Sequence, residues 1–597
     1  MASALTQTPR TRGKVDAVIV GLGWSGSLMA EELTRAGLNV VAIERGKWRD
    51  TATDFPPAVD MDELRWATRR GMMQPQAVET VTFRNTPEQT ALPVREWNCF
   101  QFGWNVGGAG THWAGMTWRF TPWDFEVASR VKRRYGMDGL DPGLLLQDWG
   151  IGYDELEPFY DRFEKIAGTS GKAGNLKGQT VPGGNPFEGP RQSDYPTPPL
   201  KDTRWMGLFR QTTEAMGYTP FTIPAGNIST EWTNPLGVRM GPCTYCGYCE
   251  MFGCGNWSKS SPQACILPAL TRRSKFEILS EAEVARVNLA DDGKTATGVT
   301  FVDANGQLWE QPADIVVISA YQIDNIRLML LSGIGKVYDP ATGKGTIGRN
   351  YAYQTISGAN LFFENERFNP FIGGGALGLQ IDEWNGDNFD HSGLGFIGGA
   401  GILVNSTNGR PIGLSDQVPE GTPAWGSEWK RALKHSYQNG TAIFNQGTSF
   451  AHRKVFADLD PTYKDRHGQP LLRVTFDYNE NDRRMAKFTM DKAVEIGRKA
   501  GAKTIQAFNS AEGHNTPYDQ RSTHTTGGVV IGADRETSAL NRYSQSWDCH
   551  NVFVLGASSF PNNAGYNPTA TVGALALHSA RAIIERYLDK REGLVAA

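Results

Sequence analysis

The sequence predicts an α/β protein with more than one domain, one of them built on a parallel β-sheet. Three observations support this prediction. The chain has 597 residues, which is too long for one compact core. Residues 15–46 show a strand–helix–strand pattern that is typical of parallel sheets. Residues 351–510 contain aromatic-rich strand patterns within longer mixed segments, which predict a second domain.

The strand–helix–strand unit carries a nucleotide-binding motif. A buried apolar run at 17–20 leads into three glycines spaced G-x-G-x-x-G, and an amphipathic helical pattern follows. A second apolar run, at 40–43, ends in an acidic residue. Such glycines allow a pyrophosphate to approach the helix N-terminus, and an acid at this distance binds ribose hydroxyls. The unit therefore predicts a dinucleotide site rather than an ordinary glycine-rich sheet turn, formed by Gly21, Gly23, Gly26, Glu44 and Arg45.

Composition and charge exclude several classes of protein. The formal net charge is −3, which argues against charge-driven binding of nucleic acid. No apolar run reaches the roughly 18 residues of a membrane-spanning helix. Residues 1–14 show no export signal and no clear structural pattern. We therefore expect a flexible segment at 1–14, and a cytoplasmic chain unless a partner subunit exports it or holds it at a membrane.

The remaining elements follow in order along the chain. Residues 62–70 have a short helical pattern, and 148–167 predict a longer helix that begins at Tyr153. Residues 276–318 alternate like the strands of a small sheet. The last strand of this group leads into a helix that ends at 332–335.

Four motifs, in order along the chain, resemble the glucose-methanol-choline (GMC) oxidoreductases. These are FAD enzymes that oxidise alcohols and sugars. Because the motifs are spread over nearly the whole chain, the resemblance covers both predicted domains. The motifs are the 15–46 unit, the segment 319–335, the triplet 348–350 and the C-terminal run 560–569.

The resemblance implies a Rossmann-like FAD-binding domain of the GMC type and a substrate-binding domain on a largely antiparallel sheet. The first would be assembled from residues 15–125, 240–350 and 520–590, and the second from 126–239 and 351–519. Beyond the first motif, the residues that it implies around FAD are Gly107, Gly108, Thr111, His112, Trp113, Gly115, Val284, Gly556, Ala557 and Thr569.

His112 has a second implied role. The stretch 106–113 resembles a segment of the family's pyranose 2-oxidases, in which the histidine of Thr-His-Trp is bonded covalently to the flavin 8α position. Many simpler members of the family have Asn near this point. The resemblance therefore implies that His112 links FAD covalently. The alternative is a histidine that only hydrogen-bonds near the isoalloxazine ring.

Oxidation of a secondary alcohol needs a base for the hydroxyl proton and an acceptor for the hydride. Histidine suits the first role because its pKa lies near working pH, and flavin supplies the second. His524 lies in a segment similar to the family's H-x-x-G, and Asn567 occupies the partner position. The resemblance implies that His524 takes the proton while Asn567 holds the substrate oxygen. The alternatives are a structural histidine and an asparagine that only caps the helix beginning at Pro568.

Four of the seven cysteines lie within twelve residues, in the spacing C-x2-C-x2-C-x4-C. Thiolates at such spacing can hold an iron–sulfur cluster or zinc. Similar bacterial dehydrogenases hold a [3Fe-4S] cluster through C-x5-C-x3-C, and the block here departs from that spacing. The sequence predicts a [3Fe-4S] or [4Fe-4S] cluster, with structural zinc, free thiols and disulfides as alternatives. The predicted ligands are Cys243, Cys246, Cys249 and Cys254.

The cysteine block also resembles the gluconate 2-dehydrogenase branch of the family. This implies oxidation of a sugar acid or sugar, with D-gluconate to 2-keto-D-gluconate as the best guess. It further implies electron transfer through the cluster to a cytochrome c subunit and quinone. A small export subunit would bring the chain to the periplasmic face of the inner membrane. The chain has no C-x-x-C-H motif, so any haem belongs to a partner.

Other functions stay open from the sequence. The substrate could be 2-ketogluconate, fructose, sorbitol or the 3-position of a glucoside, or the enzyme could be a pyranose-oxidase-like protein that uses oxygen. Two further hypotheses, a non-catalytic flavoprotein and an NAD-dependent dehydrogenase, account for fewer of the motifs. A sugar acid needs a cation for its carboxylate, and Arg521, three residues before His524, is preferred over Arg453, Lys454 and Arg542.

Overall fold

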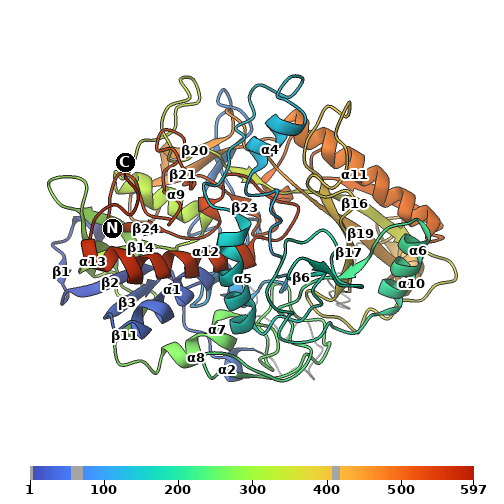
Figure 1. Ribbon diagram of the computed structural model, residues 1–597, viewed down its shortest axis with the longest axis horizontal. Coiled ribbons are helices and arrows are strands. Elements are labelled where there is room, and N and C mark those ends of the chain that lie inside the picture. The colour runs from blue at the N-terminus through green and yellow to red at the C-terminus, as the bar shows by residue number, and fades with distance from the viewer. Residues whose placement is uncertain (1–3, 56–70, 98, 407–416, 597) are drawn as a thin grey trace.

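The computed structural model describes residues 4–55, 71–97, 99–406 and 417–596. Figure 1 shows two β-sheets side by side, one at the left and one at the right, with helices packed over them. The predicted α/β class is confirmed. The predicted helical pattern at 62–70 lies outside the described residues.

The first sheet has eight strands, which come from three distant parts of the chain. Its centre is the parallel set β3–β2–β14, and β11 and β24 extend it with further parallel pairs. β2 and β3 are buried along most of their length, as expected for parallel strands that are covered on both faces. The strands are β1 (Arg10–Thr11), β2 (Val15–Val20), β3 (Val40–Glu44), β11 (Phe276–Ser280), β12 (Glu283–Leu289), β13 (Ala296–Val302), β14 (Leu308–Ile318) and β24 (Val552–Val554).

Residues 276–318 do not form the separate small sheet that their alternation predicts. The first half of β14 pairs with β13 in an antiparallel ladder, and its second half pairs with β2 and β24. One strand of eleven residues is long enough to join both ladders into a single sheet. The segment expected to be flexible at 1–14 also contributes here, because Arg10–Thr11 pairs with Trp309–Glu310.

Three helices pack together over the first sheet. α1 (Trp24–Arg35) follows the glycine motif, and α12 (Thr569–Ala582) packs against both α1 and α5 (Tyr153–Ala167). The helix predicted to begin at Tyr153 is confirmed. So is the helix predicted to end at 332–335, since α9 (Gln322–Leu331) stops one residue before Ser332. The shorter helices are η1 (Ala4–Thr6), α2 (Thr51–Asp54), η3 (Gly108–Thr111), α4 (Val127–Arg134), α7 (Pro262–Cys265), α8 (Leu267–Leu270), η4 (Pro517–Asp519), η5 (Ala557–Ser559), the π-helical turn η6 (Ile583–Tyr587) and α13 (Leu588–Lys590).

The second sheet is antiparallel throughout, with strand order β22–β16–β19–β18–β17–β8. Helix α11 (Glu480–Lys499) packs across one of its faces, while α6 (Arg204–Ala215) packs near one end and α10 (Gly426–Asn439) leads directly into β19. Its opposite face is free to form the wall of a cavity. The strands are β8 (Phe221–Thr222), β16 (Thr355–Phe362), β17 (Gly378–Ile381), β18 (Ala400–Asn405), β19 (Gly440–Gly447) and β22 (Thr504–Asn509).

Four smaller sheets complete the described fold. A four-stranded sheet is formed by β20 (Phe456–Lys464), β21 (Pro470–Thr475), β4 (Thr82–Arg84) and β5 (Leu92–Pro93). Three two-stranded pairs are β6 (Asn175–Leu176) with β7 (Gln179–Thr180), β9 (Trp232–Thr233) with β10 (Arg239–Met240), and β15 (Ala352–Tyr353) with β23 (Thr525–Thr526). Among the residues described, no helix is both long enough and apolar enough to cross a bilayer.

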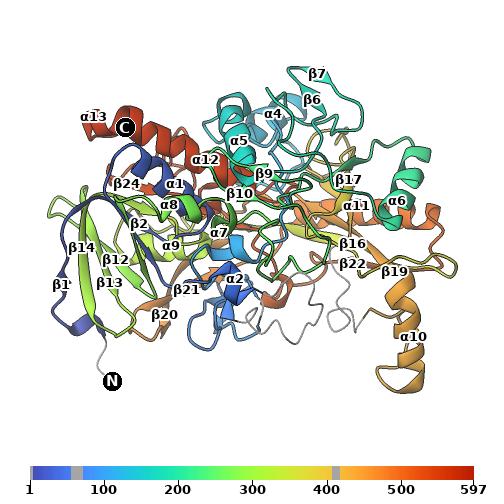
Figure 2. The ribbon, with the colours of Figure 1, turned by 90° about the horizontal axis from the view of Figure 1, so that it is seen from below.

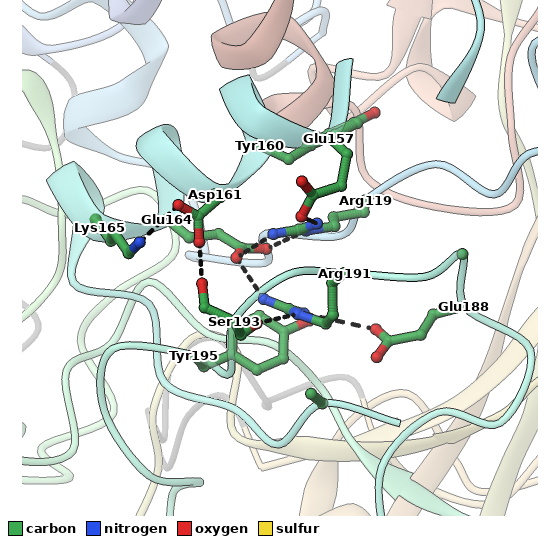
Figure 3. A network of polar contacts seen from close by, with 12 residues as sticks. Arg119, Glu157, Tyr160, Asp161, Glu164, Lys165, Glu188, Arg191, Ser193 and Tyr195 are labelled. Atoms are coloured by element: carbon green, nitrogen blue, oxygen red, sulfur yellow. Dashed lines mark hydrogen bonds and ion pairs between the residues drawn. The ribbon is translucent and has the colours of Figure 1, made fainter. Parts of the chain in front are cut away.

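A buried network of charges ties α5 to two loops (Figure 3). Glu164 of α5 accepts hydrogen bonds from Arg119 at 2.7 and 2.8 Å and also from Arg191. Arg119 donates a further bond of 3.0 Å to Glu157, which lies earlier in the same helix. The Arg191 guanidinium lies over the ring of Tyr195, 3.8 Å from its centroid. Because these charges are buried and paired, they hold α5 and the loops in one arrangement.

Candidate active site

A first cavity opens at the carboxyl ends of β2, β3 and β14. This edge of a parallel sheet is where open α/β folds bind their ligands. The N-terminus of α1 points into it, and its N-cap residue, Gly23, offers no side-chain cap to the first-turn N–H groups. Those groups are therefore available to an anion. The predicted residues that line this cavity are Gly21, Gly23, Glu44, Arg45, Gly108, Trp113, Val284, Gly556, Ala557 and Thr569.

Two of the motif glycines are required by close packing. Gly21 has a φ of +87°, and a Cβ there would lie 2.6 Å from the carbonyl oxygen of Ser319. A Cβ on Gly26 would lie 2.1 Å from the carbonyl oxygen of Gly21, so any side chain would force α1 away from the sheet. Gly26 therefore lies beneath the cavity rather than in its wall. Gly23 is different, since a Cβ there would meet no atom nearer than 3.9 Å.

Glu44 is fixed at the end of β3 by two backbone groups. Its carboxylate accepts hydrogen bonds from the N–H of Leu22 at 2.9 Å and of Gly46 at 2.8 Å. Burial raises the pKa of Glu44 above its ordinary value. A carboxylate oxygen can accept more than one hydrogen bond, so Glu44 can still take a hydroxyl donor from the cavity.

A second cavity lies over the free face of the antiparallel sheet. Side chains of β16, β18, β19 and β22 form its floor, among them Ile356, Leu403, Phe444 and Phe508. Trp113, Thr523 and Thr569 line both cavities, so the two meet along one shared wall. A ligand in the first cavity can therefore contact a ligand in the second.

His524 and Asn567 meet beside this shared wall. The Asn567 side-chain amide donates to His524 Nε2 at 2.8 Å, and both residues line the second cavity. Burial lowers the pKa of His524 to about 4, which keeps the imidazole neutral at neutral pH. Asn567 does not cap the following helix, because α12 begins at Thr569 and its N-cap residue is Pro568. The capping alternative is thus wrong for the side chain of Asn567.

His112 lies in the same cavity wall, and its ring has no hydrogen-bond partner. It is 1% exposed, and both ring nitrogens are buried without a partner. Burial, followed by the positive charge of Lys259, lowers the pKa of His112 to about 3. A neutral, unpartnered histidine ring in the interior is costly unless a ligand fills the gap.

Three predicted cofactor residues lie elsewhere. Gly115 lines the second cavity, not the first. Gly107 faces the side chain of Gln263, and a Cβ there would overlap with it. The Thr111 hydroxyl accepts hydrogen bonds from Asn105 at 2.8 Å and from Gln263 at 2.6 Å. Gly107 and Thr111 therefore shape the loop that carries His112 without lining either cavity.

The cysteine block packs directly behind the His112 segment. The N–H of Met251 donates to the His112 carbonyl at 2.6 Å. The buried ammonium of Lys259 donates to the carbonyls of Trp113 and Cys249 at 2.9 and 2.6 Å. The block thus supports the wall that the two cavities share.

The iron–sulfur prediction finds no support in this block. All seven cysteines are free thiols, so the disulfide alternative is also absent. Within the described part of the chain, no three Cys, His, Asp or Glu side chains are placed to hold a metal ion. Two of the thiols make local hydrogen bonds instead: Cys249 Sγ accepts from Asn227, while Cys254 Sγ donates to Asn256. The block does not fit a cluster in this arrangement.

Comparison with known proteins decides the family. Residues 150–356 and 458–576 match the N- and C-terminal models of the GMC oxidoreductases. The gluconate 2-dehydrogenase flavoprotein of Pantoea cypripedii is 47% identical over 98% of this chain and 96% of its own length. The chain belongs to the GMC oxidoreductase family. It is therefore an FAD-dependent oxidoreductase that acts on CH–OH groups, and the predicted family and enzyme class are confirmed.

More distant relatives agree with this assignment. The fructose dehydrogenase large subunit of Gluconobacter japonicus is 25% identical over 97% of this chain and 98% of its own length. The crystal structure of pyridoxine 4-oxidase from Mesorbium loti has a TM-score of 0.56 and 17% identity, and covers 95% of this chain and 98% of that one. The second likeness shows the GMC fold alone.

The residues of the first cavity fit the FAD of a GMC oxidoreductase. The open side of Gly23 and the uncapped N-terminus of α1 leave room and donors for a pyrophosphate. The unpartnered ring nitrogens of His112 lie in the wall of the second cavity, and the next residue, Trp113, lines both cavities. These features need a ligand to complete them.

No local motif marks the buried carboxylate that pairs with Tyr566, the neighbour of Asn567. Tyr566 donates its hydroxyl proton to the buried carboxylate of Asp382. Asp382 also accepts from Asn185 at 2.9 Å and Gln380 at 2.7 Å, and burial raises the pKa of Asp382 to about 6. Tyr566 and Asn185 come from segments far from Asp382 in the chain, so sequence reasoning could not have found this carboxylate.

Proposed function

We propose that this GMC oxidoreductase is a dehydrogenase that oxidises a secondary alcohol of a sugar acid, with D-gluconate to 2-keto-D-gluconate as the first candidate. The observation that carries the proposal is the His524–Asn567 pair in the cavity that adjoins the FAD cavity. The substrate class is supported by the 47% identity to a gluconate 2-dehydrogenase flavoprotein over 98% of this chain.

We assign each part of FAD to residues that line the first cavity. The N-terminus of α1 would hold the pyrophosphate, and Glu44 would accept from the ribose hydroxyls. Trp113 and Thr569, which line both cavities, would border the isoalloxazine ring. FAD, when bound, supplies the acceptor for the hydride of the carbinol carbon.

His524 would act as the base. A substrate hydroxyl that displaces the hydrogen bond between the two side chains can give its proton to the neutral Nε2, while the released Asn567 amide donates a hydrogen bond to the substrate oxygen. The O–H proton then resides on His524, the C–H hydrogen leaves as hydride, and the alcohol becomes a ketone. Because the low pKa of about 4 keeps the ring unprotonated, His524 is ready for this step at neutral pH.

We further propose that His112 forms the covalent link to FAD. Its two unpartnered ring nitrogens, buried in the wall of the cavity, support this role. Protein precipitated with acid should then retain its flavin, and a denaturing gel should show a fluorescent band. His112→Ala should release the flavin under the same treatment. Release from the wild type would leave His112 as a neighbour of FAD only.

Arg521 is our candidate for the substrate carboxylate. It lines the second cavity with His524, and its guanidinium lies over the ring of Tyr518. Arg521→Ala should raise KM for gluconate far more than KM for a neutral sugar. Arg204→Ala is a matched control, because Arg204 also lines the second cavity but lies far from His524 in the chain and pairs with Glu366 at 2.7 Å. Equal changes for both substrates would contradict the assignment.

We also propose a cytochrome c subunit and quinone as the route for the electrons, and a small subunit that carries the chain to the periplasmic face of the inner membrane. The match to a fructose dehydrogenase large subunit supports a multi-subunit enzyme. This electron route does not require an iron–sulfur cluster, for which the described cysteines form no ligand set.

Anaerobic titration of the flavin-loaded protein with D-gluconate tests the proposal. Gluconate should bleach the flavin absorbance band, and admission of a c-type cytochrome should restore it faster than admission of oxygen. Bleaching by 2-ketogluconate, fructose or sorbitol in place of gluconate would change the substrate. Rapid reoxidation by oxygen with release of hydrogen peroxide would make the protein an oxidase. A flavin that no polyol reduces would overturn the dehydrogenase assignment.

A further inference from the structure

Helix α10 stands away from the rest of the molecule. Figure 2 shows it projecting from the body at the lower right. Of its 14 residues, only Ser436 and Asn439, near its attached end, are buried. At 1.5 Å per residue such a helix is about 21 Å long, so most of its surface is available for contact.

One side of this helix is apolar. Large side chains recur at every fourth position, which places them on the same side of an α-helix. We call these four residues the α10 stripe: Trp425, Trp429, Leu433 and Tyr437. Trp425, at the outer end, is 83% exposed, whereas Trp429, Leu433 and Tyr437 are half-buried, and Tyr437 at the attached end also lines the second cavity. Among the residues that the structure describes, no apolar core cluster includes any member of the stripe.

Cations border the stripe. Lys430 and Lys434 lie beside it, three residues before Leu433 and Tyr437, and Arg431 lies on the opposite side. All three are exposed, and Glu428 is the acidic residue of the first turn. The chain as a whole carries a net charge of −3, so this positive cluster is a local feature. An aromatic stripe on a helix whose remaining surface carries Lys and Arg is typical of helices that lie in the headgroup region of a bilayer.

We propose that α10 docks the protein on a bilayer surface that contains anionic lipids. The stripe would enter the headgroup region, where Trp and Tyr rings are favoured, while Lys430, Arg431 and Lys434 would bind lipid phosphates. Phe371 and Ile372 extend the apolar surface at the base of the helix, because they are 51% and 47% exposed and the ring centroid of Phe371 lies 5.5 Å from that of Tyr437. This docking is made by the chain itself and does not depend on the proposed reaction or on a partner subunit.

Charge favours lipid over a second copy of the chain. A symmetric pairing of two α10 helices would bring the same cations close to one another, which is unfavourable. An anionic bilayer complements all three cations at once, and each contributes to binding within a Debye length of the surface.

Flotation of the flavin-loaded full chain with unilamellar vesicles tests the proposal. We expect binding to vesicles of phosphatidylglycerol and phosphatidylethanolamine at low salt, and none to phosphatidylcholine alone. The triple variant Lys430→Gln, Arg431→Gln, Lys434→Gln should lose affinity on the order of 100-fold. The double variant Trp425→Ser, Trp429→Ser should lose at least roughly tenfold, since burial of the rings contributes the apolar part.

Matched variants on other surfaces should bind like the wild type. They are Met137→Ser, at a side chain that is 45% exposed, and the triple Lys487→Gln, Arg498→Gln, Lys499→Gln on α11. Retained flavin absorbance and circular dichroism show that each variant is folded. Wild-type protein that ignores anionic vesicles overturns the proposal, and so does equal loss of binding in the α11 triple. The proposal is also overturned if α10 mediates dimerisation or binds an acidic protein without binding lipid. The stripe would then be a protein interface.

Discussion

Two buried polar regions of this molecule differ in how completely their groups are paired. In the network around α5, each guanidinium and carboxylate of Arg119, Arg191 and Glu164 has an ion-pair partner, although Arg191 Nη1 reaches Glu188 only at 3.6 Å and makes no hydrogen bond (Figure 3). In the wall of the second cavity, His112 has two unpartnered ring nitrogens, and His524 Nδ1 and Asn567 Oδ1 are also unpartnered. Both regions are inside the protein, so the difference is not one of exposure.

The two regions differ because their buried polar groups find hydrogen-bond partners in different places. A buried donor or acceptor without a partner costs about 1–3 kcal/mol, so a protein keeps one only where something else supplies the partner. The α5 network is completed by the chain itself and acts on stability. In the proposed function, the cavity wall is completed by cofactor and substrate and acts on chemistry. Substitutions in the two regions should therefore separate these effects.

Replacement of His524 should give the largest effect. Loss of the base in His524→Ala should lower the rate of flavin reduction by roughly 10²–10⁴-fold, while the free energy of unfolding changes little. Stopped-flow absorbance with saturating substrate measures this rate. His514→Ala, at a side chain that is 74% exposed, is the control and should react at the wild-type rate. A fall of less than about tenfold in His524→Ala would remove His524 from the role of base.

Replacement of Glu164 should lower stability and leave the rate of flavin reduction unchanged, the opposite of replacing His524. Glu164→Gln leaves Arg119 and Arg191 short of a buried negative charge, which should lower the free energy of unfolding by about 3–5 kcal/mol. Denaturant unfolding followed by circular dichroism measures this loss. The rate of flavin reduction per folded molecule should stay unchanged. Glu585→Gln, which breaks an exposed pair with Arg581, should cost about 0–1 kcal/mol. A Glu164→Gln variant that is as stable as the wild type but reduces flavin slowly would contradict the comparison of the two regions.

The pH dependence of stability should report the burial of His524. Its pKa is about 4 in the folded protein and about 6.5 in an unfolded chain. Between these values the unfolded state binds more protons, so stability falls as pH falls. The contribution lost from His524 between pH 7 and 5 is about 2 kcal/mol. Unfolding of wild type and His524→Gln at both pH values should show a shallower dependence in the variant. Parallel curves would mean that His524 is not kept neutral by the fold.

Removal of the Tyr566 hydroxyl should give the smallest effect. Tyr566→Phe loses the bond to Asp382, and the resulting shift of Asn567 should lower kcat roughly tenfold with KM nearly unchanged. Steady-state kinetics measure both constants. Tyr543→Phe is the control, because the Tyr543 hydroxyl pairs with Arg586 rather than with residues of the cavities. A change in KM alone would show that Tyr566 serves substrate binding and not the placement of Asn567.

Much of the first sheet was predictable because its signals are local. The apolar runs of β2 and β3, the three glycines and Glu44 all lie within residues 15–46, and each acts on neighbours in the chain. The sheet that residues 276–318 join was not predictable in the same way. Periodicity indicates a strand but not its partners, and β14 joins two ladders only because β2 and β24 lie beside it.

In the candidate site, too, local motifs were predictable and contacts between distant segments were not. His524, Asn567 and His112 were found from motifs, whereas the cysteine spacing predicted a metal centre that the described thiols do not form. Spacing in sequence limits how far apart the ligands can be, but it does not reveal the hydrogen-bond partners of the thiols, which are Asn227 for Cys249 and Asn256 for Cys254.

Sequence was thus sufficient for the elements and motifs whose geometry depends on residues a few positions apart: the nucleotide-binding turn, the main helices and the family. Tertiary structure decided how distant segments meet. It brings Trp113, Thr523 and Thr569 into one wall between two cavities, and it pairs Asp382 with Tyr566, the neighbour of Asn567. It also leaves Trp425, at the outer end of the α10 stripe, 83% exposed. Such contacts join residues far apart in the chain, and only packing of the whole chain selects them.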